Sequence, residues 1–176
     1  MDYYVWQRTC QNLRRWMDEG LDVVPVSVNA SRRDFSRTDY LQRLLEPVKE
    51  YGLTPELLHI EVTESIIADD PDLIRQVLTD CRARGFQVEM DDFGAGYSSL
   101  TLLGQLPLDV LKLDMGLVQQ TNDERKARIL AATLSLARSL GLKTIAEGVE
   151  TEEQLQQLRS LDCEGIQGFY FSRPLP

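Results

Sequence analysis

The sequence predicts an α/β fold in which parallel strands alternate with helices. Short apolar stretches typical of buried strands alternate with amphipathic helical stretches throughout the 176 residues. No long linker or low-complexity stretch interrupts this alternation, which is typical of parallel sheets with crossover helices. In addition, polar residues recur at the carboxyl ends of the strands, where parallel barrels place their active sites.

The first half of the chain contains three strand candidates. The first helix is indicated by Trp6, Cys10, Leu13 and Met17, whose spacing gives one apolar stripe, and Gly20 can end it. A later helix contains Pro47, which predicts a kink or a break. The expected elements are helix 2–19, strand 23–28, helix 38–51, strand 57–62, helix 71–84 and strand 86–90.

The second half repeats the pattern and brings the total to about six strands. Gly141 is placed to end the longest helix, and Thr151 with Gln154 forms a capping-box pattern at the start of the next one. The expected elements are a short helix near 98–104, strand 109–114, helix 123–140, strand 143–146, a helix from 151 and strand 165–171.

Composition narrows the function classes. The net charge of −9 argues against binding to a DNA or RNA polymer, which needs a basic face. The three cysteines are far apart and form no CxxC pair, which favours reduced thiols in a cytoplasmic protein. No apolar run has the length of a membrane span, so we expect no membrane contact by this chain. The single histidine, His59, excludes any site that needs a His pair and is best interpreted as a strand residue beside the core.

Two adjacent carboxylates, Asp91 and Asp92, follow the strand predicted at 86–90 and precede the Gly-containing stretch from Gly94 to Ser99. A pair of buried carboxylates is unfavourable unless a cation compensates it, and a divalent metal is the simplest such cation. A solvated turn with an aspartate as helix N-cap is the alternative interpretation. The rest of the chain favours the metal.

Every predicted strand delivers a polar residue at or near its carboxyl end. Lys112 and Asp114 are two residues apart, so both point to the same side of their strand. Carboxylates plus an amide oxygen suit Mg²⁺ or Mn²⁺, and several acids with one lysine suit two-metal phosphoryl chemistry. The residues concerned are Asn29, Glu61, Asp91, Asp92, Lys112, Asp114, Glu147 and Gln167.

These stretches together resemble the EAL domain, the bacterial cyclic di-GMP phosphodiesterase. The resemblance runs the length of the chain, in the family's order. It rests on residues 27–31, 61–65, 91–99, 111–114, 146–151, 167–169 and 171–175.

The resemblance implies a TIM-type (β/α) barrel that hydrolyses cyclic di-GMP to pGpG with two Mg²⁺ or Mn²⁺ ions. Asn29 and Glu61 are similar to ligands of the first metal, and Asp91 is similar to the ligand that bridges both. The resemblance also assigns Asp92 and Glu147 to the second metal, Lys112 with Gln167 to the attacking water, and Glu64, Asp114, Gly94, Tyr97, Ser98, Glu150 and Arg173 to the substrate or to the loop that couples the metal site to a dimer interface.

The family's own Glu-Ala-Leu motif is absent from this sequence. We therefore expect residues 1–176 to be a single truncated EAL-type domain, with opening strands missing from a barrel of roughly 250 residues and with an impaired first metal site. We expect activity of the chain alone to be weak or absent. Open sheet edges favour association, so we expect a homodimer. The resemblance also implies a parent protein with upstream sensory or GGDEF-type domains.

Two other functions are compatible with the sequence. A catalytically degenerate module that binds cyclic di-GMP or a protein partner would explain the absent Glu, although the other proposed ligands are all present. A different phosphoryl enzyme on the same scaffold is the third hypothesis, because one fold hosts many chemistries.

Overall fold

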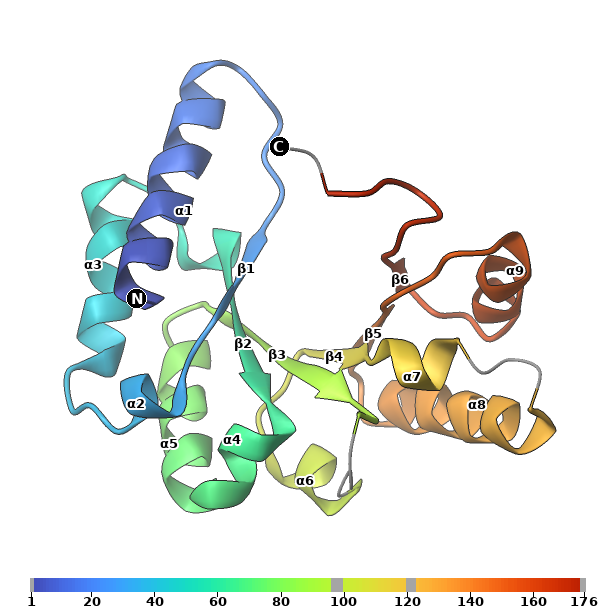
Figure 1. Ribbon diagram of the computed structural model, residues 1–176. Coiled ribbons are helices and arrows are strands. Elements are labelled where there is room, and N and C mark those ends of the chain that lie inside the picture. Colours follow the sequence, from blue (N-terminus) through green and yellow to red (C-terminus); the bar gives the residue numbers. More distant parts are fainter. Residues whose placement is uncertain (1, 96–99, 120–122, 175–176) are drawn as a thin grey trace. The chain divides into compact units, whose positions relative to one another are not determined.

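Six parallel strands alternate with helices in a computed structural model that describes residues 2–95, 100–119 and 123–174 (Figure 1). The strands follow one another in the sheet in chain order, from β1 to β6. The pairings of β1 with β2, β4 with β5 and β5 with β6 are all parallel. This confirms the predicted class, an incomplete TIM-type (β/α) barrel with six of the usual eight strands.

The strands are short and the helices between them are of very different length. The strands are β1 (Val26–Asn29), β2 (Leu58–Thr63), β3 (Gln87–Phe93), β4 (Val110–Leu113), β5 (Lys143–Ala146) and β6 (Gly165–Ile166). The helices are α1 (Asp2–Asp18), α2 (Arg32–Phe35), α3 (Tyr40–Glu50), the 3₁₀ turn η1 (Pro55–Leu57), α4 (Glu64–Asp69), α5 (Pro71–Arg82), α6 (Leu100–Gln105), α7 (Met115–Val118), α8 (Glu124–Ser139) and α9 (Glu152–Ser160).

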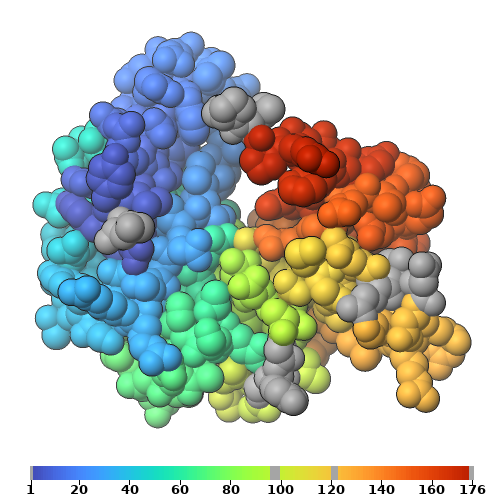
Figure 2. All heavy atoms as spheres, in the orientation of Figure 1, coloured from blue at the N-terminus to red at the C-terminus, as the bar shows by residue number. Residues whose placement is uncertain are grey.

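The chain divides into two compact units, each with its own core. The first contains Met1–Glu89 and Gln105–Pro107, and the second contains Met90–Gly104 and Leu108–Pro176. In the first unit, Trp6 of α1 packs edge-on against Tyr40 of α3, with ring centroids 5.7 Å apart. The opposite side of α1 is exposed, with Tyr4 and Val5 at the surface (blue in Figure 2).

The second unit is built around β4 and β5, which α8 covers. Every residue of β4 is buried, as expected for a parallel strand with both faces covered. Leu130, Leu134 and Ala137 of α8 are buried as well, whereas Ile129 is 54% exposed. The buried stripe of α8 therefore contains Leu130, Leu134 and Ala137 and leaves Ile129 at the surface.

Two strands and one helix differ in the structure from their predicted extents. The first strand begins at Val26, because Pro25 cannot donate to the ladder. The helix around Pro47 is uninterrupted, so the predicted break there is wrong. The third strand does not end before the acidic pair but continues through both aspartates to Phe93.

The last strand is much shorter than the predicted 165–171. Beyond Ile166 the backbone turns around Val149, whose N–H donates to Gln167 O and whose carbonyl accepts from Tyr170 N. A Cβ at Gly168 would lie 2.1 Å from Val149 O, so only glycine permits this close approach. The strand ends here because these hydrogen bonds use the Gln167 carbonyl and the Tyr170 N–H, which a longer strand would pair with its neighbour in the sheet.

No helix in the described part of the chain is both long enough and apolar enough to cross a bilayer.

Candidate metal centre

The end of β3 brings two adjacent aspartates to one place. Neighbouring side chains on a regular strand point to opposite faces, but Asp92 has a left-handed backbone with φ of 57°. Aspartate tolerates this region better than most residues. With this turn, Asp91, Asp92 and Glu147 each direct a carboxylate oxygen into one cluster, in which these atoms lie within 4.8 Å of one another.

Lys112 lies within the same cluster. Its Nζ is 3.0 Å from Asp91 Oδ1 and 2.8 Å from Glu147 Oε1, and the residue is only 8% exposed. The three side chains come from β3, β4 and the residue after β5, whose N–H donates to Leu113 O. The carboxyl ends of consecutive strands thus meet here, as predicted from the sequence.

The net negative charge of the cluster favours binding of a cation. Burial, followed by the negative charges of Asp91 and Asp114, raises the pKa of Asp92, while Lys112 acts in the opposite direction. Three carboxylates against one ammonium leave two more negative than positive charges when all are ionised.

The donor set fits a hard divalent ion. All three acidic groups offer oxygen, the ligand that Mg²⁺ and Mn²⁺ prefer. Asp91 Oδ1 is buried and accepts no hydrogen bond from the described residues, since its contact with Lys112 Nζ is an ion pair without hydrogen-bond geometry. A cation would satisfy this oxygen and offset the surplus charge.

Asn29 and Glu61 form a pair in the first unit. They are register partners at the ends of β1 and β2, and Ala30 N donates to Glu61 O at 3.1 Å. Glu61 is 8% exposed, whereas Asn29 is exposed, with its carbonyl accepting from Trp6 Nε1 at 3.2 Å. Both side-chain types are oxygen donors, as the predicted first metal site requires.

The remaining predicted residues have different surroundings. Asp114 caps α7 by accepting from Gly116 N at 2.7 Å. Gln167 is exposed directly after β6. Glu150 accepts a long hydrogen bond from Gln119 at 3.4 Å. Glu64 opens α4.

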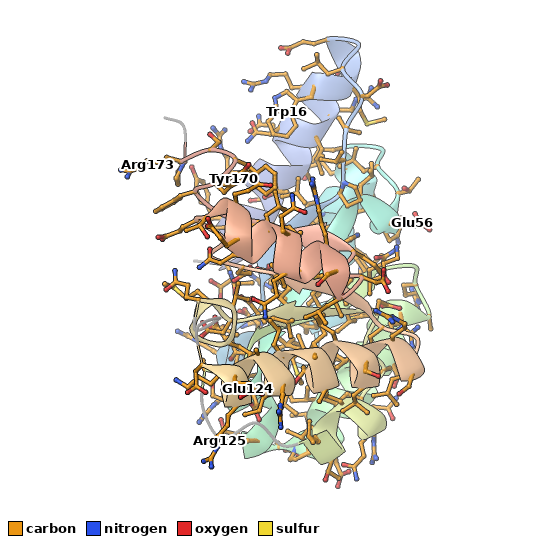
Figure 3. All side chains as sticks on the ribbon, turned by 90° about the vertical axis from the view of Figure 1, so that its right-hand side faces the viewer. Trp16, Glu56, Glu124, Arg125, Tyr170 and Arg173 are labelled. Atoms are coloured by element: carbon orange, nitrogen blue, oxygen red, sulfur yellow. The ribbon has the colours of Figure 1, made fainter. Side chains whose placement is uncertain are left out.

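The structure describes the first residues of the loop predicted from Gly94 to Ser99. Gly94 has φ of 98° and packs on Leu117, whose Cδ2 would be 3.4 Å from an added Cβ. Tyr97 and Ser98 fall outside the described residues. Farther along, the Arg173 guanidinium lies 5.4 Å above the Phe169 ring, in the exposed C-terminal segment that Figure 3 shows beside α9.

Sequence reasoning missed a buried acid. Glu89 is 2% exposed and contacts both Ser27 and His59, the histidine that we interpreted only as a strand residue beside the core. A signal was present, because Glu89 precedes Asp91 by two residues and so shares its face of the strand. The alternation of β3 alone does not separate a buried polar face from a solvated one.

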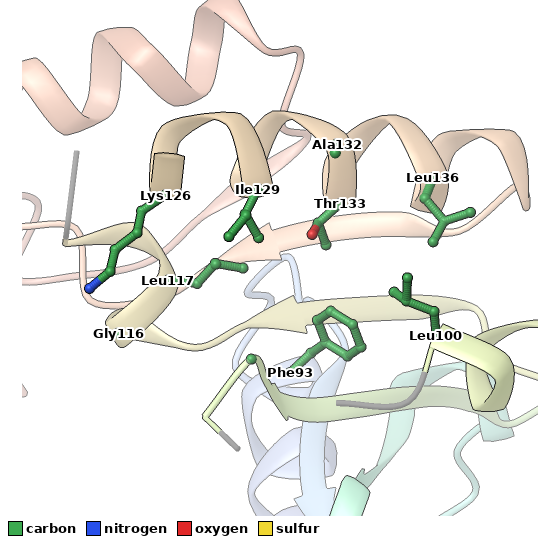
Figure 4. Close-up of a pocket in the computed structure, with 10 residues that line it drawn as sticks. Phe93, Leu100, Gly116, Leu117, Lys126, Ile129, Ala132, Thr133 and Leu136 are labelled. Atoms are coloured by element: carbon green, nitrogen blue, oxygen red, sulfur yellow. The ribbon is translucent and has the colours of Figure 1, made fainter. Parts of the chain in front are cut away.

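A separate apolar pocket of about 570 Å³ lies in the second unit (Figure 4). Phe93 and Leu100 form one side of it, and Ile129 and Leu136 of α8 form another. Its one charged lining residue is Lys126, at one end in the close-up. None of its described lining residues is a carboxylate, so among these residues the pocket is distinct from the acidic cluster.

Comparison with known proteins identifies the family of the chain. The EAL domain family model matches residues 1–174. The bifunctional diguanylate cyclase/cyclic di-GMP phosphodiesterase MucR of Pseudomonas aeruginosa is 37% identical over 174 residues, which are 98% of this chain and 25% of that protein. Curated relatives are thus much longer, and the chain spans about a quarter of their length.

Solved structures lead to the same family. The structure of the PaMucR phosphodiesterase in complex with c-di-GMP has a TM-score of 0.91 and 37% identity, covering 99% of this chain and 71% of that one. The manganese/cy-diGMP complex of Klebsiella pneumoniae BlrP1 has a TM-score of 0.85 and 32% identity, covering 98% and 45%. By its sequence and its fold, the chain belongs to the EAL domain family.

Proposed function

We propose that residues 1–176 form one truncated EAL-type domain with a metal-dependent site for hydrolysis of cyclic di-GMP to pGpG. The observation that carries this proposal is the position of Lys112 between Asp91 and Glu147, in a cluster that also contains Asp92. The c-di-GMP and manganese complexes of its relatives support the choice of substrate and of Mg²⁺ or Mn²⁺.

In this proposal Asp91, Asp92 and Glu147 of the second unit hold one cation. Asn29 and Glu61 of the first unit are the proposed ligands of another. When bound, such ions lower the pKa of water and offset charge on the phosphate. Lys112 contributes an ammonium group that can donate to the attacking water. Asp91 and Glu147 fix the position of this ammonium group. Gln167 assists from the end of β6.

The absent Glu-Ala-Leu motif limits the expected rate. Loss of one carboxylate ligand should lower the rate on the order of 10³-fold or more. We therefore propose weak turnover by this chain alone, with the second metal site intact; complete absence of turnover belongs to the alternative below. A degenerate binding module is the alternative that the absent motif favours.

Substrate binding and turnover separate these functions. Calorimetric titration with cyclic di-GMP in Mn²⁺ should show binding, and chromatography at high enzyme concentration should detect pGpG at a low rate. Binding without any pGpG would select the degenerate module. If cyclic di-GMP does not bind, the proposal is wrong for this chain, and a screen of linear and cyclic dinucleotides would test for another phosphoryl enzyme.

We also propose a cytoplasmic homodimer, in a parent protein with sensory or GGDEF-type domains. The greater length of the relatives supports the additional domains. Support for self-association comes from Leu100 and Ile129, which line the apolar pocket and are 59% and 54% exposed. Light scattering should give twice the monomer mass for the chain and the monomer mass for Ile129→Glu. A stable wild-type monomer would reject the dimer.

A further inference from the structure

Ser27, His59 and Glu89 form a buried hydrogen-bonded group within the first unit. Ser27 Oγ donates to Glu89 Oε2 at 2.9 Å, and His59 Nδ1 lies 2.5 Å from Glu89 Oε1. Since a carboxylate accepts, the ring N–H of His59 donates in this pair. The Glu89 side chain is 3% exposed and that of His59 is 14% exposed. One carboxylate thus joins three consecutive strands.

The positions of these residues relate them to the proposed metal ligands. Ser27 and His59 are register partners in β1 and β2, and Asn29 and Glu61 are partners two residues later. Glu89 likewise precedes Asp91 by two residues in β3. Residues two apart on a strand share a face, so the hydrogen-bonded group is a polar layer directly before the layer of proposed ligands.

The fold itself does not require such a group. A buried carboxylate is unfavourable unless hydrogen bonds or charges compensate it, and an apolar side chain of similar size packs without that cost. The presence of a buried Glu89 with both carboxylate oxygens hydrogen-bonded therefore favours a role in the site. Hydrogen bonds behind metal ligands commonly orient them and tune affinity.

We propose that Glu89 is a positioning residue for the metal site. By holding Ser27 and His59, it fixes how β1, β2 and the first part of β3 are aligned along their axes within the first unit, and hence how each of these strands continues into the proposed ligand two residues later. It acts through the strands and does not ligate the metal. This inference rests on the proposed function, because it assumes that Asp91 and its neighbours bind a cation.

Mn²⁺ titration calorimetry on the whole chain tests this role without any need for turnover. Glu89→Ala removes both hydrogen bonds and should weaken Mn²⁺ binding about 10- to 100-fold. Glu89→Gln keeps an oxygen to accept from His59 and an amide to face Ser27. We therefore expect this variant to bind within about threefold of wild type.

A matched control separates positioning from loss of stability. Leu78→Ala truncates a fully buried side chain of α5 in the same unit and should lower the urea midpoint while leaving the Mn²⁺ affinity unchanged. Ser27→Ala removes one hydrogen bond and little volume, so we expect it to fold. Its Mn²⁺ affinity is the test if Glu89→Ala does not fold. Ser27→Ala should weaken Mn²⁺ binding about threefold.

The outcomes are distinct. If folded Glu89→Ala, or Ser27→Ala in its place, binds Mn²⁺ as wild type does, the positioning role is wrong while the proposed function stands. If Glu89→Gln loses as much affinity as Glu89→Ala, the charge of Glu89 acts rather than its hydrogen bonds, which also overturns the proposal. If wild type itself binds no Mn²⁺, the proposed function fails and the inference fails with it.

Discussion

Lys112 Nζ lies 2.8 Å from Glu147 Oε1, although 34 intervening residues separate the two in the sequence. Their strands are neighbours in parallel register, with Leu113 opposite Ala146, so each side chain leaves its strand at the same end. The pair therefore follows from topology and register. The ammonium group of Lys112 lies beside carboxylates that a divalent cation would also contact, and it already offsets part of their negative charge.

Replacement of Lys112 by methionine should tighten metal binding. The ammonium repels a cation and holds two of its proposed ligands, so Lys112→Met should raise the Mn²⁺ affinity about five- to tenfold while lowering any pGpG formation. Calorimetry measures the affinity. Lys143→Met, which removes an exposed positive charge at the start of β5, should leave affinity unchanged. Weaker binding by Lys112→Met would show that the lysine supports the metal site.

Gly148, directly after Glu147, should tolerate no side chain. Its φ is 71°, and a Cβ would lie 2.4 Å from the Cβ of Met115. Strain and overlap together should lower the free energy of unfolding by about 2–4 kcal/mol in Gly148→Ala. Gly104→Ala is the control, because no atom lies within 4 Å of its added Cβ in α6, and it should stabilise by about 0.5–1 kcal/mol. Urea denaturation measures both, and equal stabilities would refute the packing described around Gly148.

The cysteines should be protected in the native state. Burial, with a smaller effect of nearby acids, raises the pKa of Cys10 to about 11 and of Cys81 to about 12. Because the thiolate is the reactive form, iodoacetamide at pH 8 should label these two at least about 100-fold more slowly in the native protein than in urea. Mass spectrometry counts the labels.

The raised pKa values of these two thiols also determine how the free energy of unfolding changes with pH. Each folded thiol keeps its proton at a pH where the unfolded thiol has lost it. The free energy of unfolding should therefore be unaffected by these groups below about pH 8.5 and should decrease as pH rises above it toward the folded values. An increase in the urea midpoint between pH 8 and pH 10 in the wild type, absent when Cys10 and Cys81 are both replaced by alanine, would contradict this sign.

Much of the fold could be predicted because local signals and topology agree. Strand and helix alternate clearly, and Gly20, Gly85 and Gly141 mark helix ends by their left-handed backbones. The position of polar residues after strands then predicted that Asp91, Lys112 and Glu147 would meet, because parallel strands share an end.

Other features depend on contacts that a pattern does not contain. The acidic pair continues β3 because its backbone hydrogen-bonds onward, as when Asp114 N donates to Phe93 O. The final strand is short because Gly168 packs against Val149. Burial of Glu89 depends on the partners that Ser27 and His59 provide from two other strands, and no local spacing encodes those pairings.

Binding of Mn²⁺ to the wild-type chain and to Asp91→Asn is the most direct test of the central claim. Asp91 contributes a buried oxygen without a hydrogen bond from the described residues to the cluster with Asp92 and Glu147. We expect that wild type binds Mn²⁺ and that Asp91→Asn, folded by circular dichroism, binds at least about 100-fold more weakly. Equal affinity of the two proteins, or no binding by the wild type, would contradict this claim.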